Sequence, residues 1–245
     1  MLKALAKRAG LEVIPAWRSA LYPQAEYIRK LFDLLSIDCV LDVGANVGQF
    51  RDFLRLHVGY HGRIVSFEPM PECVSALKRR ASEDRAWEIR PVALSSVNGK
   101  AVLNVMRGSE FNSLHKPDAS LPARFVEWNQ VERTLEVETQ RLDDVMPVLL
   151  PSASYSRVYL KMDTQGHDLE VMRGAADTLG LIPALQTEIA FVRVYEGAPG
   201  WEATFREVLE RGFEVSGIFP NNPHHFPRMY EADCHFINRS VVTQK

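Results

Sequence analysis

The chain has 245 residues, 46% of them hydrophobic and 24% charged, and this composition excludes a disordered, collagen-like or coiled-coil protein. The formal charge of −2 at pH 7 provides no global cationic field for a polyanion, so no nucleic-acid partner is expected. There is no apolar run of the roughly 18 residues that a membrane span needs, so none is expected.

Strands and helices alternate along most of the chain. Short apolar runs predict strands, and apolar residues at helical spacing predict helices. We expect strands over residues 39–43, 63–67, 88–93, 157–162, 184–189, 213–219 and 234–238, and helices over 27–35, 47–56, 71–81, 169–179 and 201–210. Repeated strand–helix units favour an α/β fold with a mostly parallel sheet and helices on both faces.

Three features depart from this alternation. Residues 101–106 and 134–139 alternate like strands at the margin of a sheet. The weakly periodic stretch 108–132 is a candidate for an insertion or lid. The last two strands, 213–219 and 234–238, have no helix between them, so we expect an antiparallel pair.

The chain shows no internal linker, so we expect one domain over residues 27–245 after an N-terminal helical extension over 1–26. Residues 1–10 lack the apolar stretch of a secretory signal and predict a short amphipathic helix. Three widely spaced cysteines form no Cys-x-x-Cys pair: Cys39, Cys73 and Cys234. They indicate reduced thiols in a cytoplasmic protein, without a disulfide framework or a structural zinc site.

A glycine-containing turn follows the first expected strand and opens a helix. Gly44 and Gly48 would remove side chains where a ligand approaches the backbone, and helical N–H groups would face its polar atoms. The spacing is Gly-x-x-x-Gly around Asn46, whereas dinucleotide enzymes carry Gly-x-Gly-x-x-Gly. Glu68 follows the second strand, 20 residues after Gly48, where a carboxylate can reach a ribose diol. Together with Asp42, these residues predict a nucleoside site.

The motifs LDVGANVGQF, SFEPMPE, VALSS and LKMDTQGHDLEVMRGA together resemble the FkbM-type S-adenosylmethionine-dependent methyltransferases. The resemblance runs from about Tyr27 to Arg239. It implies a class I methyltransferase, Rossmann-like fold, in which a seven-stranded and mostly parallel sheet has an antiparallel last strand and helices on both faces. It also implies S-adenosylmethionine as the cofactor.

The resemblance further implies which residues hold that cofactor. They are Asp42, Gly44, Asn46 and Gly48 around its methionine part, Glu68 at the ribose hydroxyls with Pro69 beside it, Ala93 at the adenine, and Asp163 near the amino or sulfonium end. Many relatives carry an acidic residue after this aspartate. Thr164 and Gln165 stand there in this chain, which argues against a role for a second carboxylate.

Methyl transfer from a sulfonium is an in-line displacement, so the protein mainly aligns donor and acceptor. A hydroxyl acceptor also needs a proton acceptor or a metal. His167, four residues after Asp163, is the first candidate for a catalytic base, and a polar helix start is its structural alternative. No metal-ligand cluster accompanies His224 and His225, which we expect in an exposed loop.

Candidate acceptor-binding residues follow the strands or lie in the irregular segment: Asn112, Ser113, Glu188 and Tyr195. Each has a structural alternative. Asn112 and Ser113 could form turns, Glu188 could pair with Arg193, and Tyr195 could pack against the last helix.

The leading prediction is O-methylation of a hydroxyl on a saccharide or secondary metabolite, with a small molecule such as a sugar or glycan precursor as partner. Two alternatives stay open. A nicotinamide-dependent oxidoreductase shares the glycine turn and the ribose-binding acid, but it is disfavoured by the missing third glycine and by the two late strands. A non-catalytic scaffold of the same fold would bind cofactor weakly and transfer nothing.

Overall fold

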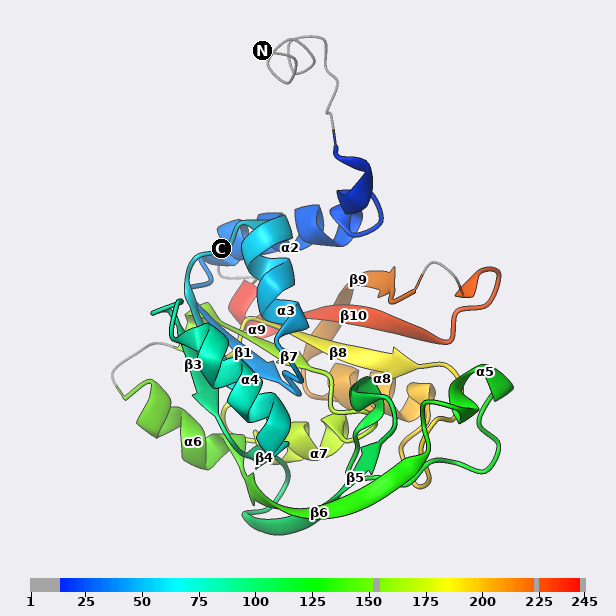
Figure 1. Cartoon of the computed structure of the whole chain (residues 1–245). Helices are drawn as coiled ribbons and strands as arrows, with labels where there is room; N and C mark the ends of the chain where they lie inside the picture. Colours follow the sequence, from blue (N-terminus) through cyan, green and yellow to red (C-terminus); the bar gives the residue numbers. More distant parts are fainter. Residues whose placement is uncertain (1–13, 152–154, 223–224, 243–245) are drawn as a thin grey trace.

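The computed structural model describes residues 14–151, 155–222 and 225–242. A seven-stranded sheet forms its centre, in the order β3-β2-β1-β7-β8-β10-β9 (Figure 1). The strands are β1 (Cys39–Val43), β2 (Arg63–Phe67), β3 (Trp87–Arg90), β7 (Val158–Met162), β8 (Ala184–Ala190), β9 (Phe213–Pro220) and β10 (Glu231–Asn238). β1 pairs in parallel with β2 and β7, whereas β10 is antiparallel to both β8 and β9. The predicted fold class and the late antiparallel pair are therefore confirmed.

Helices cover both faces of this sheet (Figure 1). One face carries α2 (Tyr22–Leu35), α3 (Gln49–Asp52) and α4 (Pro71–Ala81), and the other carries α6 (Leu142–Leu149), α7 (Asp168–Arg173) and α8 (Trp201–Glu210). Val40 and Ile64 are register partners that face the first layer, and Leu41 and Val65 face the second. Two cores result, since successive side chains of a strand point to opposite faces. No helix in the described ranges is long and apolar enough to cross a membrane.

A second, three-stranded sheet lies beside the first. Its order is β4-β6-β5, from β4 (Ala93–Leu94), β5 (Gly99–Met106) and β6 (Val131–Gln140). Residues 101–106 and 134–139 are strands, as expected, but they pair with each other in this separate sheet and pack on Met70 and Cys73. Alternation predicts a half-buried strand but does not specify its partner. The connection between β5 and β6 holds η3 (Ser109–Phe111) and the short α5 (Ala123–Val126).

Two expected helices differ from the observed ones. The helix predicted over 47–56 starts at Gln49 and continues from Phe53 to Val58 as a π-helix. The helix predicted over 169–179 ends at Arg173. There the Gly174 carbonyl accepts the N–H of Asp143 at 3.0 Å, and a Cβ on Gly174 would lie 2.0 Å from the carbonyl oxygen of Ser95. A tertiary contact at Gly174 thus ends this helix, although the apolar pattern of the sequence continues beyond it.

The helix expected over residues 27–35 starts earlier in the structure. α2 begins at Tyr22, with a proline in its first turn, so the boundary expected at residue 26 falls inside a helix. The amphipathic helix expected over residues 1–10 lies outside the described residues.

Candidate active site

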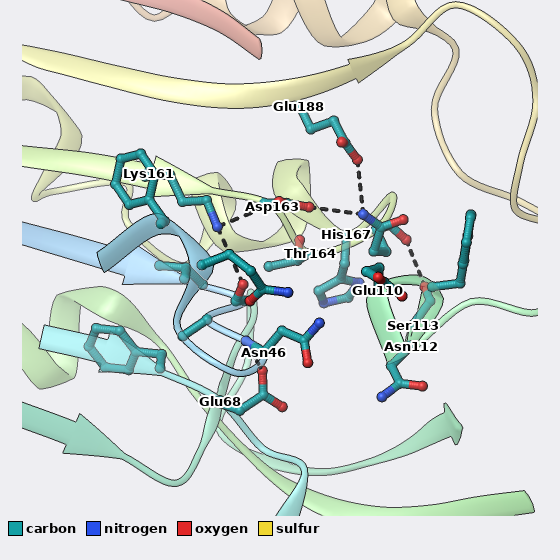
Figure 2. A pocket seen from close by; sticks show the side chains of 18 of the residues that line it. Asn46, Glu68, Glu110, Asn112, Ser113, Lys161, Asp163, Thr164, His167 and Glu188 are labelled. Atoms are coloured by element: carbon teal, nitrogen blue, oxygen red, sulfur yellow. Dashed lines mark hydrogen bonds and ion pairs between the residues drawn. The ribbon is translucent and has the colours of Figure 1, made fainter. Parts of the chain in front are cut away.

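A cavity of about 470 Å³ opens where β1, β2, β7 and β8 end (Figure 2). Open α/β sheets bind their ligands at this edge. The lining includes most of the residues expected at the site: Gly44, Asn46, Glu68, Pro69, Ala93, Asn112, Ser113, Asp163, His167 and Glu188. Asp42, Gly48 and Tyr195 do not line it, and Asp42 and Tyr195 are buried.

Gly44 and Gly48 are required by the turn itself. Their φ angles are +79° and +93°, in the region that favours glycine. A Cβ on Gly44 would lie 1.9 Å from the carbonyl oxygen of Asp163, and one on Gly48 would lie 2.9 Å from the ring of Trp87. At each position the chain itself is thus a reason for glycine, and Gly44 also lines the cavity.

Main-chain groups anchor the Glu68 carboxylate in the cavity wall. Its Oε2 accepts the N–H of Asn46 at 2.8 Å, and its Oε1 accepts that of Met70 at 2.8 Å. Asn46 has a φ of +47°, a left-handed conformation that asparagine tolerates. Burial outweighs the two hydrogen bonds and raises the pKa of Glu68 to about 7. Each oxygen keeps a further lone pair, so Glu68 can also accept hydrogen bonds from a diol.

Asp42 and Lys161 form a buried pair behind the glycine turn. Asp42 is fully buried; its Oδ1 lies 3.1 Å from Lys161 Nζ, and its Oδ2 accepts the Ser66 hydroxyl at 2.9 Å. Lys161 Nζ also donates to the Gly44 carbonyl at 3.3 Å and reaches the cavity. Burial lowers the pKa of Lys161, but the charges of Asp42 and Asp163 outweigh it and raise that pKa above its ordinary value. Lys161 therefore carries a positive charge that fixes the turn.

His167 lines the cavity at the N-cap of α7. Its Nε2 lies 3.0 Å from Ser95 Oγ, and its Nδ1 lies 3.3 Å from His115 Nε2. Burial, and then the nearby His115, lowers the pKa of His167 to about 4. The ring is therefore neutral at pH 7, with both nitrogens hydrogen-bonded inside the protein.

An amide links Asp163 and Glu188. Gln165 Nε2 donates to Asp163 Oδ1 at 2.9 Å and to Glu188 Oε2 at 3.0 Å (Figure 2). The alternative of an ion pair between Glu188 and Arg193 is not observed. Arg193 pairs instead with Asp118 in the β5–β6 connection, where its Nε lies 3.9 Å from Asp118 Oδ2. Tyr195 is buried behind this wall, and its hydroxyl donates to Gln165 Oε1 at 2.8 Å.

The connection between β5 and β6 supplies another side of the cavity. Asn112 Oδ1 accepts the N–H of Met106 at 2.8 Å, and Ser113 Oγ donates to the Gln165 carbonyl at 2.7 Å. Both residues thus tie this connection to neighbouring segments and also line the cavity.

The expected exposure of the paired histidines was wrong for the one that can be placed. His225 is buried, with its ring centroid 5.9 Å from that of Phe125 and 5.1 Å from that of Tyr230. His224 lies outside the described residues. No group of three or more His, Cys, Asp or Glu side chains in the described ranges could hold a metal ion. The three cysteines are free and buried.

Several polar residues of the lining were missed: Gln24, Lys161, Gln165, Gln186, Glu231 and Asp233. Lys161 and Gln165 lie inside a motif already singled out, so their position was a usable signal. Gln24 comes from the segment assigned to the extension, and its amide donates to Asp233 Oδ2 at 2.8 Å. Nothing local in the sequence indicated that contact.

Comparisons with known proteins agree with the motifs. The sequence model of the Methyltransferase FkbM domain matches residues 42–215. A curated relative, the 2-O-methyltransferase NoeI of Sinorhizobium fredii, is 27% identical over 191 residues, which cover 74% of each chain.

Similar solved structures include fibrillarin from Aeropyrum pernix with bound S-adenosyl-L-methionine, at a TM-score of 0.49 and 13% identity, covering 87% of this chain and 73% of that one. Magnesium protoporphyrin IX methyltransferase from Synechocystis has a TM-score of 0.44 and 14% identity, covering 90% and 81%. The oxidoreductase alternative is not favoured. The family match spans more than half of the chain, so this protein belongs to the FkbM methyltransferase domain family and is an S-adenosylmethionine-dependent methyltransferase.

Proposed function

We propose that this methyltransferase methylates a hydroxyl oxygen of a saccharide or a related secondary metabolite. The observation that carries the proposal is one cavity with Glu68 on one side, Glu188 on the other and Asp163 between them (Figure 2). Such a cavity has room for a nucleoside at the first carboxylate and a hydroxyl-rich acceptor at the second. A relative named as a 2-O-methyltransferase supports oxygen as the acceptor atom.

The residues present fit the cofactor. Glu68 has free lone pairs for the ribose hydroxyls, and Pro69 and Ala93 offer apolar surface for the adenine. Gly44 and Asn46 would border the methionine part, with Asp163 facing its amino or sulfonium end. When bound, S-adenosylmethionine supplies an electrophilic methyl group.

The chain's own contribution is to hold the acceptor in line with that methyl group and to keep water out. Asn112, Ser113 and Glu188 would bind acceptor hydroxyls. Tyr195 would support these residues indirectly, through its hydrogen bond to Gln165. Residues 108–132 would act as the lid over the acceptor. We extend the functional domain to α2, because Gln24 reaches the cavity from it.

The site of action that we propose is the cytoplasm. The three buried, free cysteines support it, because reduced thiols are the rule in that compartment.

A transfer assay tests the function. The purified protein is incubated with S-adenosylmethionine that carries a labelled methyl group, together with a panel of mono- and disaccharides. We expect label on a saccharide in an alkali-stable methyl ether, which excludes a methyl ester. Label confined to amines or carboxylates, or no transfer to any hydroxyl, would contradict the proposal.

A further inference from the structure

We propose that Glu188 is the general base of the methyl transfer and that Gln165 is the residue that positions it. The proposal rests on the proposed function, because it requires a hydroxyl acceptor. It assigns proton acceptance to a carboxylate near the C-terminal end of β8, on the opposite side of the cavity from Glu68 (Figure 2).

The Gln165 side chain contacts three neighbouring groups of this wall. Its Nε2 donates to Asp163 Oδ1 at 2.9 Å and to Glu188 Oε2 at 3.0 Å, and its Oε1 accepts the Tyr195 hydroxyl at 2.8 Å. In this orientation the amide oxygen faces a hydroxyl donor and the amide nitrogen faces two carboxylate acceptors, so all three partners are satisfied. Glu188 is therefore held at a fixed place beside Asp163.

The Gln165 backbone is also constrained. Its φ is +55°, which costs free energy for a residue with a long side chain. The Ser113 hydroxyl donates to its carbonyl at 2.7 Å, and Gly166 follows with a φ of +90°. Backbone strain of this kind persists where surrounding contacts enforce it, which is common at functional sites.

Glu188 keeps the capacity to take a proton. Asn221 donates to its Oε1 and Gln165 to its Oε2, so each oxygen retains an unused lone pair. Within the part of the chain that the structure describes, no Lys, Arg or His forms an ion pair with Glu188. By contrast, both ring nitrogens of His167 are engaged, and Lys161 Nζ lies 3.6 Å from Asp163.

The electrostatics strengthen Glu188 as a base. The pKa of Glu188 is raised well above its ordinary value. Burial is the largest cause, and the surrounding carboxylates are the next. Those carboxylates are Asp163 after β7, Asp168 on α7, and Glu231 and Asp233 on β10, where Asp233 is the cross-strand partner of Glu188. A carboxylate whose pKa approaches the working pH is a better proton acceptor than an ordinary one.

The step is balanced. A lone pair of the acceptor oxygen forms the new O–CH₃ bond while the S–CH₃ bond breaks and its electron pair stays on sulfur. The hydroxyl proton moves to a Glu188 oxygen and then leaves to solvent. The products are the methyl ether, the neutral thioether S-adenosylhomocysteine and one proton.

The test compares the wild type with Glu188→Gln and Gln165→Glu, using the saccharide that the wild type methylates. Glu188→Gln should lower kcat about 100-fold or more and abolish the rise of kcat with pH. Gln165→Glu places a third carboxylate against Asp163 and Glu188, so that rise should move to higher pH by about one unit or more. Gln140→Glu, the same change at an exposed position on β6, should leave kcat and its pH dependence unaltered.

Two measurements without acceptor accompany the assay. Affinity for S-adenosylhomocysteine should stay within about twofold of wild type in Glu188→Gln, which also reports folding. Because folding raises the Glu188 pKa above 4.5, this group's contribution to stability is complete below that pH and is lost as pH rises. The Tm of the wild type relative to Glu188→Gln should therefore fall from pH 5 upward.

The outcomes separate the two proposals. If the wild type methylates a saccharide and Glu188→Gln keeps its kcat and pH profile, this inference is wrong and the proposed function stands. A folded Gln165→Glu protein with an unshifted profile would equally overturn the role of Gln165, even where Glu188→Gln fails to fold. If the wild type methylates no hydroxyl, the proposed function fails and this inference fails with it.

Discussion

The ammonium of Lys161 on β7 lies 3.1 Å from the carboxylate of Asp42 on β1, with side-chain exposures of 5% and 0%. The two residues are register partners on neighbouring parallel strands. The pair stands behind the glycine turn, and Lys161 also donates to the Gly44 carbonyl. Asp42 is fully buried and does not line the cavity, so its link to the cavity runs through Lys161.

Lys161→Met should lower the free energy of unfolding by about 3–5 kcal/mol, because it leaves the Asp42 carboxylate buried without a counter-ion. Urea denaturation followed by circular dichroism measures the change. The double variant Lys161→Met/Asp42→Asn should regain part of the loss. A cost below about 1 kcal/mol for Lys161→Met would show that water reaches Asp42 and that the pair contributes little.

Gly44→Ala tests the close approach of the Asp163 carbonyl. Gly59 offers a matched control, since its φ of +80° equals that of Gly44 within a degree and a Cβ there would meet nothing within 4 Å. Gly59→Ala should cost roughly 1–2 kcal/mol for the left-handed backbone alone. Gly44→Ala should cost at least about 2 kcal/mol more, through overpacking against a backbone atom. If urea denaturation gives equal losses of stability for the two variants, the turn at Gly44 can shift away from the Asp163 carbonyl without cost.

Glu68→Ala should weaken binding of S-adenosylhomocysteine more than tenfold, or about 1.4 kcal/mol, because hydrogen bonds to a charged group are lost. Isothermal titration calorimetry measures this directly. NADH titrated in parallel should not bind. Unchanged affinity in a folded variant would remove Glu68 from the cofactor site.

The same carboxylate predicts a pH dependence of binding. Because burial raises the Glu68 pKa from 4.5 to about 7, the carboxyl of the free protein takes up a proton as pH falls through 7. Ribose hydroxyls donate better to the ionised form, so the affinity for S-adenosylhomocysteine should decrease below pH 7. The decrease should approach tenfold for each pH unit. The stability contribution has the opposite sense: it is complete below pH 4.5 and is lost as pH rises through 7. Glu68→Gln should show neither trend.

The parts of the fold that could be predicted are those determined by the residues of the segment itself. Residues 39–43 and 63–67 are short apolar runs that are buried on both faces, and such runs are recognisable as central parallel strands. Glu68 was placed correctly at the cavity because a strand end fixes its position relative to the glycine turn. The second sheet was missed as a separate sheet, since the alternation over 101–106 leaves its pairing partner open.

The parts of the site that could not be predicted depend on contacts between distant segments. The amide of Gln165 bridges Asp163 with Glu188, which lies 23 residues further along the chain. Gln24 meets Asp233 across a separation of 209 residues. Neither contact leaves a periodic pattern, so single-sequence reasoning finds these residues only by their position next to a motif.

His167→Asn separates the two candidates for the base. If Glu188 takes the proton, this variant should keep the pH profile of kcat, lose less than about tenfold in kcat and bind S-adenosylhomocysteine like the wild type. Loss of the pH-dependent rise would instead assign the base to His167. Because burial lowers the His167 pKa from 6.5 to about 4, its contribution to stability is present above pH 6.5 and is lost as pH falls towards 4. The Tm of the wild type relative to His167→Asn should therefore decrease on acidification through that window, whichever residue is the base.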